Sequence, residues 1–167
     1  VGLAASVRIV NPQSMKKEDF VSGGTATGEM LDFLSECIRY GISVCVAGAT
    51  SSGKTTVAGW LLTTIPDRKR IFSIENGSRE LDLVREYDGR VVNSVVHTLT
   101  RDSENDRQRI DQIALLDIAL RFNPDILVVG EMRGAEANAA QEAARTGVAV
   151  VTTIHSNSCE ATYRRMV

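Results

Sequence analysis

A glycine-rich segment at residues 48–55 restricts the fold of this chain more than any other part of the sequence. Its eight residues match the pattern G-x-x-x-x-G-K-[ST] at every position. In order, they are Gly48, Ala49, Thr50, Ser51, Ser52, Gly53, Lys54 and Thr55. The apolar run Ile42–Ala47 precedes the segment, and a helical pattern follows it to about Thr64. We therefore predict a buried strand, a tight turn and a helix in direct succession.

The residue types of this turn suit the binding of phosphate groups. Glycines allow backbone N–H groups to converge on phosphate oxygens, and the start of the following helix adds its positive end. We expect Lys54 to reach the β and γ phosphates of ATP and the Thr55 hydroxyl to bind Mg²⁺. Thr56 completes the predicted nucleotide-binding segment. The structural alternative is a tight turn with an exposed lysine.

Strand-like and helical patterns alternate along the rest of the chain. We expect strands at residues 70–74, 91–99, 125–129 and 148–154, and helices at residues 29–40, 103–122 and 135–145. Strands that are apolar at nearly every position are typical of a sheet buried on both faces. We therefore predict an α/β fold, with a mostly parallel sheet and helices on both faces. Residues 11–28 are polar and are expected to form a connector.

The expected helix at residues 103–122 is based on a capping pattern. Ser103 is followed three residues later by Asp106, which is the spacing of a capping box. The residues expected on its buried face are Ile110, Ile113, Leu116 and Leu120.

Acidic residues follow two of the predicted strands. Glu75 ends the strand at residues 70–74, and Glu131 follows the strand at residues 125–129. Because an open α/β sheet binds ligands at the carboxyl ends of its strands, we expect both carboxylates at the nucleotide site. Glu80, five residues after Glu75, is a further candidate. The alternative for Glu80 is a structural cap or ion pair.

Length and composition exclude several classes of protein. With 167 residues, 43% of them hydrophobic and 24% charged, the chain has the size and composition of one soluble globular domain. Nineteen basic residues against 21 acidic ones, with only 5% aromatic residues, argue against a nucleic-acid-binding groove. The longest apolar run, at residues 147–153, is too short for membrane insertion. Three cysteines without a CxxC pair argue against a zinc site and favour the reducing cytoplasm.

Four blocks of the sequence, in this order, resemble the secretion traffic ATPases, the hexameric motors of type II and type IV secretion and of type IV pili. The blocks are residues 48–55, Ile74–Asn76 with Glu80 and Leu81, residues 120–136, and residues 146–155. The nearest resemblance is to the tight-adherence (Flp) pilus and conjugation branch. It implies that residues 1–28, including Ser6–Arg8, are the end of an N-terminal domain and a linker. Residues 29–167 are then a RecA-like ATPase domain, truncated at its C-terminus.

The resemblance also implies roles for individual residues. Glu75 matches the acidic-box glutamate, a general base that orients the attacking water. Glu131 matches the Walker B glutamate, which acts on Mg²⁺ through water. His155 matches the second histidine of the histidine box, which couples the nucleotide state to movement. Arg101 matches an arginine near the nucleotide or the neighbouring subunit, and Arg133 matches the arginine after the Walker B glutamate.

Two other residues are interpreted as structural. Asp125 matches the aspartate at the start of the Walker B strand, and His97 lies within a strand pattern. Two further positions depart from the family pattern. Asn76 stands where an aspartate is usual, which removes a negative charge near the metal, and Val148 stands in place of the first histidine of the histidine box.

The function that this resemblance implies is an ATP-hydrolysing motor for pilus assembly or protein secretion. In its full-length form it would be a homohexamer, docked on an inner-membrane platform protein at the cytoplasmic face. The alternative is a nucleotide-dependent binding or scaffold module with little hydrolysis, which Asn76 and Val148 favour. A DNA-acting ATPase lacks its basic groove here, and a small-molecule kinase fits the order of the blocks poorly.

Overall fold

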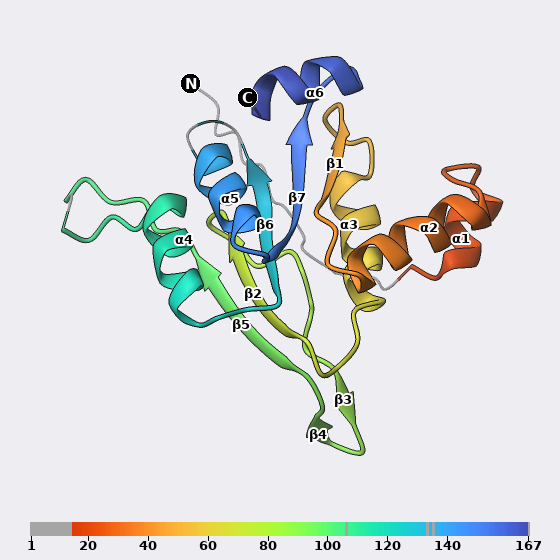
Figure 1. Cartoon of the computed structure of the whole chain (residues 1–167), viewed down its shortest axis with the longest axis horizontal. Helices are drawn as coiled ribbons and strands as arrows, with labels where there is room; N and C mark the ends of the chain where they lie inside the picture. Colours follow the sequence, from red (N-terminus) through yellow and green to blue (C-terminus); the bar gives the residue numbers. More distant parts are fainter. Residues whose placement is uncertain (1–14, 106, 133, 135, 167) are drawn as a thin grey trace, which may run out of the picture.

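A five-stranded parallel sheet organises the chain (Figure 1). The computed structural model describes residues 15–166 with the exception of residues 106, 133 and 135. The strands run in the order β1-β7-β6-β2-β5. Their bounds are Val44–Gly48 (β1), Arg70–Glu75 (β2), Ser94–Leu99 (β5), Ile126–Met132 (β6) and Ala149–His155 (β7). A two-stranded hairpin projects from one end, formed by Glu86–Tyr87 (β3) and Arg90–Val91 (β4).

Helices cover both faces of the sheet (Figure 1). Their bounds are Lys17–Ser22 (α1), Gly28–Arg39 (α2), Lys54–Thr63 (α3), Gln112–Arg121 (α4), Glu136–Arg145 (α5) and Cys159–Met166 (α6). On one face, Leu116 of α4 and Ala140 of α5 pack against Phe72 and Leu127 of the sheet. On the other face, α2 and α3 contribute Ile38, Leu61 and Leu62 to a second core over β2, β6 and β7. The predicted α/β architecture, with a parallel sheet covered on both sides, is confirmed.

The carboxyl ends of the strands meet at one edge of the sheet because all neighbouring strands are parallel. The register places Gly48 at the end of β1 beside His155 at the end of β7. A register shift in the pairing of β6 with β7 lies between Val129 and Met132. Bulges of this kind redirect side chains near functional sites, and this one contains Glu131.

The segment predicted to be a polar connector contains the short helix α1. Its Phe20 is only 2% exposed, and its ring centroid lies 5.7 Å from that of Trp60 on α3. Only one residue of α1 is buried, so its sequence carries too little apolar periodicity to indicate a helix. Residues 1–14, among them Ser6–Arg8, lie outside the described part of the chain.

The prediction of a helix over residues 103–122 is wrong in its first half. Helix α4 begins at Gln112, and Asp111 caps it by accepting a hydrogen bond from the backbone N–H of Ala114 at 2.8 Å. The Ser103 hydroxyl instead accepts from the N–H of Asn105 at 3.1 Å, a local bond that competes with helix formation. Asp106, its predicted capping partner, lies outside the described residues.

The buried face of α4 also differs from the one predicted. Leu115, Leu116 and Ala119 are buried, whereas Ile113 and Leu120 are exposed. The strand predicted at residues 91–99 is divided into β4 and β5. Within the described residues, no helix is both long enough and apolar enough to cross a membrane.

Candidate active site

A cavity of about 820 Å³ opens at the carboxyl edge of the sheet. It lies between the turn after β1, the segment after β2 and the ends of β6 and β7. The predicted site residues in its lining are Thr50, Ser51, Ser52, Gly53, Lys54, Thr55, Thr56, Glu75, Glu80, Glu131 and His155. Residues far apart in the sequence, including every predicted carboxylate, therefore share one cavity.

The turn between β1 and α3 has the backbone shape of a phosphate-binding loop. Gly53 has φ = 84°, a left-handed conformation that glycine adopts without strain, and α3 begins at the next residue. The loop is tight at its start, since a Cβ added to Gly48 would lie 2.5 Å from the Ser52 hydroxyl oxygen. The first turn of α3 faces the cavity, and helix N-termini attract anions.

Lys54 is buried over this turn with its ammonium group held in place. Lys54 is only 8% exposed, and its Nζ donates to the carbonyl oxygen of Ala49 at 2.6 Å. The same Nζ lies 3.3 Å from Nδ1 of His155. The lysine is thus fixed at the place where an anion would meet the loop.

His155 joins this lysine to the carboxylate at the end of β6. Its Nε2 lies 3.0 Å from Oε1 of Glu131, while its Nδ1 faces Lys54. Because an ammonium group can only donate, Nδ1 of His155 is the acceptor in its contact with Lys54. The structure therefore brings Lys54, His155 and Glu131 into one connected group.

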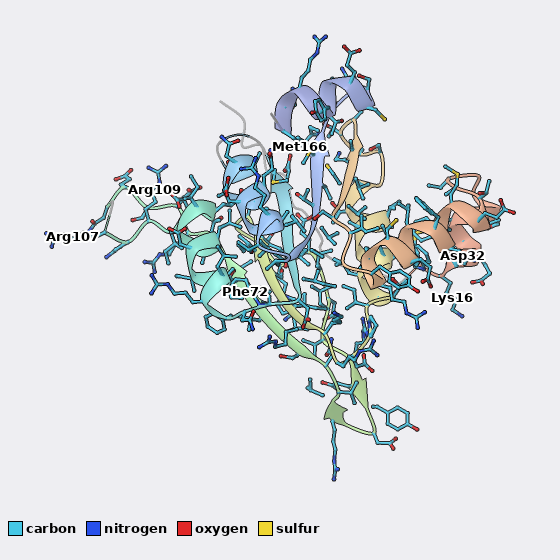
Figure 2. All side chains as sticks on the ribbon, in the orientation of Figure 1. Lys16, Asp32, Phe72, Arg107, Arg109 and Met166 are labelled. Atoms are coloured by element: carbon cyan, nitrogen blue, oxygen red, sulfur yellow. The ribbon has the colours of Figure 1, made fainter. Side chains whose placement is uncertain are left out.

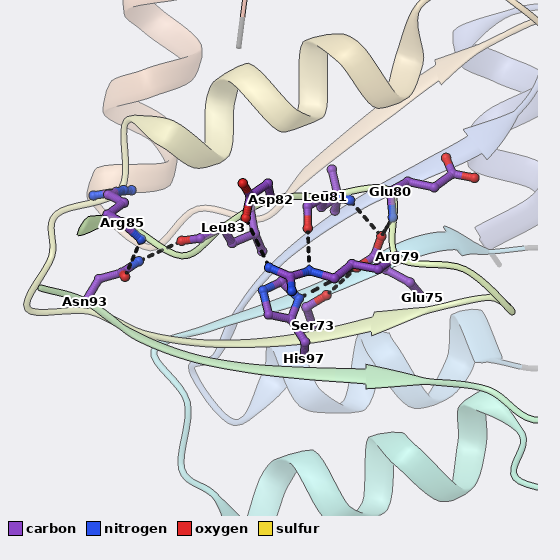
Figure 3. Close-up of polar contacts among 10 residues, drawn as sticks. All are labelled: Ser73, Glu75, Arg79, Glu80, Leu81, Asp82, Leu83, Arg85, Asn93 and His97. Carbon is purple, nitrogen blue, oxygen red and sulfur yellow. Dashed lines mark hydrogen bonds and ion pairs between the residues drawn. The ribbon is translucent and has the colours of Figure 1, made fainter. Parts of the chain in front are cut away.

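Glu75 lines the cavity but is almost fully buried, and Figure 3 shows its polar contacts. Its Oε2 accepts from the backbone N–H groups of Glu80 at 2.7 Å and Leu81 at 2.9 Å, and its Oε1 accepts from the Ser73 hydroxyl at 3.2 Å. Burial alone would raise the pKa of this carboxyl. The nearby His97 ring and the N–H and hydroxyl donors outweigh burial and hold the pKa below its ordinary value.

A family model for secretion proteins covers this sequence from end to end. Described as "Type II/IV secretion system protein", it matches residues 1–167. The chain belongs to this family. The predicted family membership is therefore confirmed, although the tight-adherence branch within it remains a prediction.

Relatives with curated descriptions are longer than this family member. An uncharacterised protein of Methanocaldococcus jannaschii is 36% identical over 148 residues, which cover 89% of this chain and 52% of that protein. The type IV secretion system protein PtlH of Bordetella pertussis is 33% identical over 137 residues, which cover 81% of this chain and 38% of PtlH. The chain therefore spans about half, or less, of the length of these relatives.

Solved structures in the same family have the same fold. The VirB11 ATPase of the Brucella suis type IV secretion system, in complex with sulphate, is 26% identical with a TM-score of 0.61, covering 96% of this chain and 45% of VirB11. The pilus retraction motor PilT with bound ADP is 29% identical with a TM-score of 0.64, covering 81% of this chain and 37% of PilT. These similarities confirm the RecA-like ATPase fold.

Of the two predicted arginines, the structure describes Arg101, which is not part of the cavity lining. Arg101 is exposed, and its Nε donates to the carbonyl oxygen of Gln108 at 2.7 Å. Arg133 lies outside the described residues. Any role of Arg101 at the nucleotide therefore stays a prediction.

Asp125 has the contacts of a structural residue. It accepts from the backbone N–H of Arg70 at 2.8 Å and from Nζ of Lys69 at 3.3 Å. Burial acts to raise the pKa of this carboxyl, but the Arg70 bond and the positive Lys69 lower it below its ordinary value. These contacts connect the start of β6 to the start of β2, at the edge of the sheet opposite the cavity.

The two departures from the family pattern have different surroundings. Oδ1 of Asn76 accepts from Nε2 of Gln112 at 3.0 Å and from the Thr100 hydroxyl at 3.3 Å. An aspartate would offer the same acceptor oxygen, so the contacts are independent of the lost charge. Val148 is half-buried and packs against the core beneath α4 and α5.

Two residues near the cavity were not recognised from the sequence. His97, interpreted as structural only, has its Nδ1 3.8 Å from Oε1 of Glu75. Gln112 is 8% exposed, and its amide reaches both Asn76 and the backbone carbonyl of Glu131. In the sequence, Gln112 is a polar residue at the start of an apolar helical pattern. Such residues are common, so its contacts cannot be recognised without the fold.

The cavity lining contains residues that fit a nucleotide-bound Mg²⁺. Among the described residues, no group of three or more histidine, cysteine, aspartate or glutamate side chains is arranged to hold a metal. Mg²⁺ in nucleotide sites takes one or two protein ligands and completes its shell with phosphate and water. Thr55 and Glu131, which share the cavity lining, supply such a set.

Proposed function

We propose that this chain binds and hydrolyses ATP as the RecA-like domain of a motor that powers type IV pilus assembly or type II/IV secretion. The observation that carries this proposal is the connected group of Lys54, His155 and Glu131 beside a phosphate-binding turn. Solved relatives support it, because they are an ATPase of type IV secretion and a pilus motor with bound ADP.

The loop and Lys54 would hold the phosphates of ATP. Residues 50–56, which include the start of α3, line the cavity, and phosphate oxygens are natural acceptors for the N–H groups at the start of a helix. Lys54 would exchange its bond to the Ala49 carbonyl for the β and γ phosphates. Thr55 would bind Mg²⁺ directly and Glu131 through water, and the ion would neutralise charge that develops on the phosphates.

The contacts of the acidic segment favour a division of roles between its two glutamates. Both oxygens of Glu75 already accept hydrogen bonds, and its side chain is buried. These bonds fix the backbone at residues 80 and 81, and so place Glu80, which is half-buried, in the cavity lining. We therefore assign the orientation of the attacking water to Glu80, and the positioning of Glu80 to Glu75, in place of the base role predicted for Glu75.

This assignment is tested by paired amide variants. Glu80→Gln should lower kcat about 100-fold while the melting temperature stays the same, because only the transition state loses a carboxylate. Glu75→Gln should lower both kcat and the melting temperature. A full loss of turnover with unchanged melting temperature in Glu75→Gln alone would return the base role to Glu75.

Assembly into a ring of six and docking on an inner-membrane platform protein at the cytoplasmic face belong to the same proposal. Family membership supports them, and Arg101, which is exposed, would be accessible to a neighbouring subunit. Closure against an N-terminal domain would convert hydrolysis into movement.

The steady-state ATPase rate of the full-length protein against its concentration tests this function. A rate per subunit that rises with concentration supports a site completed between subunits. A flat rate near zero alongside clear ATP binding would overturn the motor and leave the alternative, a nucleotide-dependent binding or scaffold module. Val148 stands in place of the first histidine of the histidine box and packs into the core. This difference is the observation that favours the alternative.

A further inference from the structure

The side-chain amide of Gln112 connects two strand ends that carry acidic residues. Gln112 is the first residue of α4, and only 8% of it is exposed. Its Nε2 donates to Oδ1 of Asn76 at 3.0 Å and to the backbone carbonyl oxygen of Glu131 at 2.9 Å. Both N–H groups of the amide are thereby used, and the end of β2 is joined to the end of β6.

The same oxygen of Asn76 is bonded from the other side by Thr100. The Thr100 hydroxyl lies 3.3 Å from Oδ1 of Asn76, and the Thr100 N–H donates to the carbonyl oxygen of Glu75 at 2.9 Å. Thr100 and Gln112 flank a loop at residues 101–110. Its ends are closed by two backbone bonds between Arg101 and Ile110, each 2.9 Å long.

This loop carries charges of both signs, with three arginines against Asp102, Glu104 and Asp106. Arg101, Arg107 and Arg109 are all exposed, and Figure 2 shows the last two on a loop that projects beyond the body of the molecule. Asn76, which holds both ends of the loop, is at the same time part of the cavity lining. Oδ1 of Asn76 therefore lies between the cavity and the loop at residues 101–110.

We propose that Gln112 is a positioning residue for hydrolysis, and that it ties the loop at residues 101–110 to the end of β6. The inference rests on the proposed function. The two partners of Gln112 in this tie, the Glu131 carbonyl oxygen and Asn76 Oδ1, are both acceptors. The tie therefore requires a side chain with two N–H donors. A buried amide that loses these partners is costly, which keeps the tie formed.

Kinetics of a variant of equal size provide the first test. Gln112→Glu removes both donors and sets a carboxylate against two oxygens, so kcat of the full-length protein should fall by about 10-fold to 100-fold with KM for ATP unchanged. The matched control is Gln108→Glu, since Gln108 lies exposed in the same loop. An unchanged kcat in Gln112→Glu would overturn the inference.

Gln112→Met provides a second variant without a buried charge, in case Gln112→Glu does not fold. It retains most of the side-chain volume but has no donor. It should show the same fall in kcat with a melting temperature close to that of the wild type. A loss of kcat that only follows the loss of folded protein would reduce Gln112 to a structural residue.

Hydrogen–deuterium exchange tests the tie without requiring hydrolysis. In the wild type, a non-hydrolysable ATP analogue should change the exchange of residues 100–111 relative to ADP, and in Gln112→Met this difference should disappear. Persistence of the difference in the variant would overturn the tie. A wild-type protein that binds both nucleotides but does not turn over ATP would overturn the proposed function, and the exchange result would still decide the inference.

Discussion

The phosphate-binding turn and the segment from residue 75 to residue 112 face the same cavity but are held in different ways. The turn depends on its own backbone, with a left-handed Gly53 and a bond from Lys54 to Ala49, five residues earlier. The second segment depends on contacts between residues that are distant in sequence, such as the bond from Gln112 to Asn76, 36 residues away. The first region is specified locally, whereas the second needs the finished sheet to form.

Glu131 is the point at which these two regions meet, so its substitution should have the largest effect. Glu131→Gln should lower kcat about 100-fold to 1,000-fold and leave ATP affinity nearly unchanged, because the lost charge acts in the transition state. Steady-state kinetics and calorimetric titration measure the two quantities. Glu142→Gln, on the exposed face of α5, is the control. An equal loss of ATP affinity and kcat would mean that Glu131 contributes to the binding of ATP in the ground state.

Substitution of Lys54 isolates the locally held region. Lys54→Ala should weaken ATP binding about 100-fold, since a charged hydrogen-bond donor to phosphate is lost. Titration calorimetry of ATP measures the change, and Lys69→Ala is a suitable control because Lys69 pairs with Asp125 at the opposite edge of the sheet. Unchanged affinity in Lys54→Ala would contradict the assignment of the turn.

The buried Glu75 gives the distantly held region a dependence on pH. Its folded-state pKa lies below the ordinary value of 4.5, so its ionised form stabilises the fold above that pH and the stabilisation is lost as pH falls through the folded-state pKa. At pH 7, Glu75→Gln should reduce the free energy of unfolding by about 1–3 kcal/mol. The difference from wild type should shrink below pH 4.5, as urea unfolding would show.

The control for this measurement is Glu86→Gln, in the exposed β3–β4 hairpin. It should leave the free energy of unfolding unchanged at both pH values. A difference between Glu75→Gln and wild type that stays constant with pH would mean that charge on Glu75 does not contribute to stability.

Arg85 connects the second region to the C-terminal end of α3, away from the turn, and should have the smallest effect. Its guanidinium donates to the carbonyl oxygens of Leu62 at 3.0 Å and Ile65 at 2.5 Å, next to the end of the helix that begins at Lys54 (α3). Arg85→Ala should lower the free energy of unfolding by about 1 kcal/mol, because these bonds are partly exposed. Urea unfolding measures this, with Arg90→Ala as control. A larger fall in ATP affinity than in stability would show that the link tunes the turn itself.

The difference between the two regions also explains what the sequence could predict. The turn, the strands that precede the carboxylates and the placement of Glu131 and His155 at one edge follow from local patterns and from the parallel sheet. The loop at residues 101–110 does not, because the Ser103 pattern favours a helix until the backbone pairing of Arg101 with Ile110 is known. Local patterns alone therefore misplace the start of α4.

The contacts of Glu75 could not be predicted for a related reason. Its position at the end of β2 predicted a carboxylate at the cavity, and Glu75 is part of the cavity lining. Its hydrogen bonds to residues 80 and 81 depend on how the following segment turns back over the strand end, and no periodicity encodes such a turn. The contact between Phe20 and Trp60 was also not predicted, because it joins two helices, α1 and α3, that are distant in the sequence.

The bonds to Asn76 have a consequence for how this family can vary. Asparagine and aspartate share an acceptor oxygen and nearly the same shape, so either residue keeps the bonds from Thr100 and Gln112. One codon change therefore adds or removes a full negative charge in the cavity lining while the hydrogen-bonded frame stays in place. Evolution can retune the ionic environment of the site here without redesigning the architecture that surrounds it.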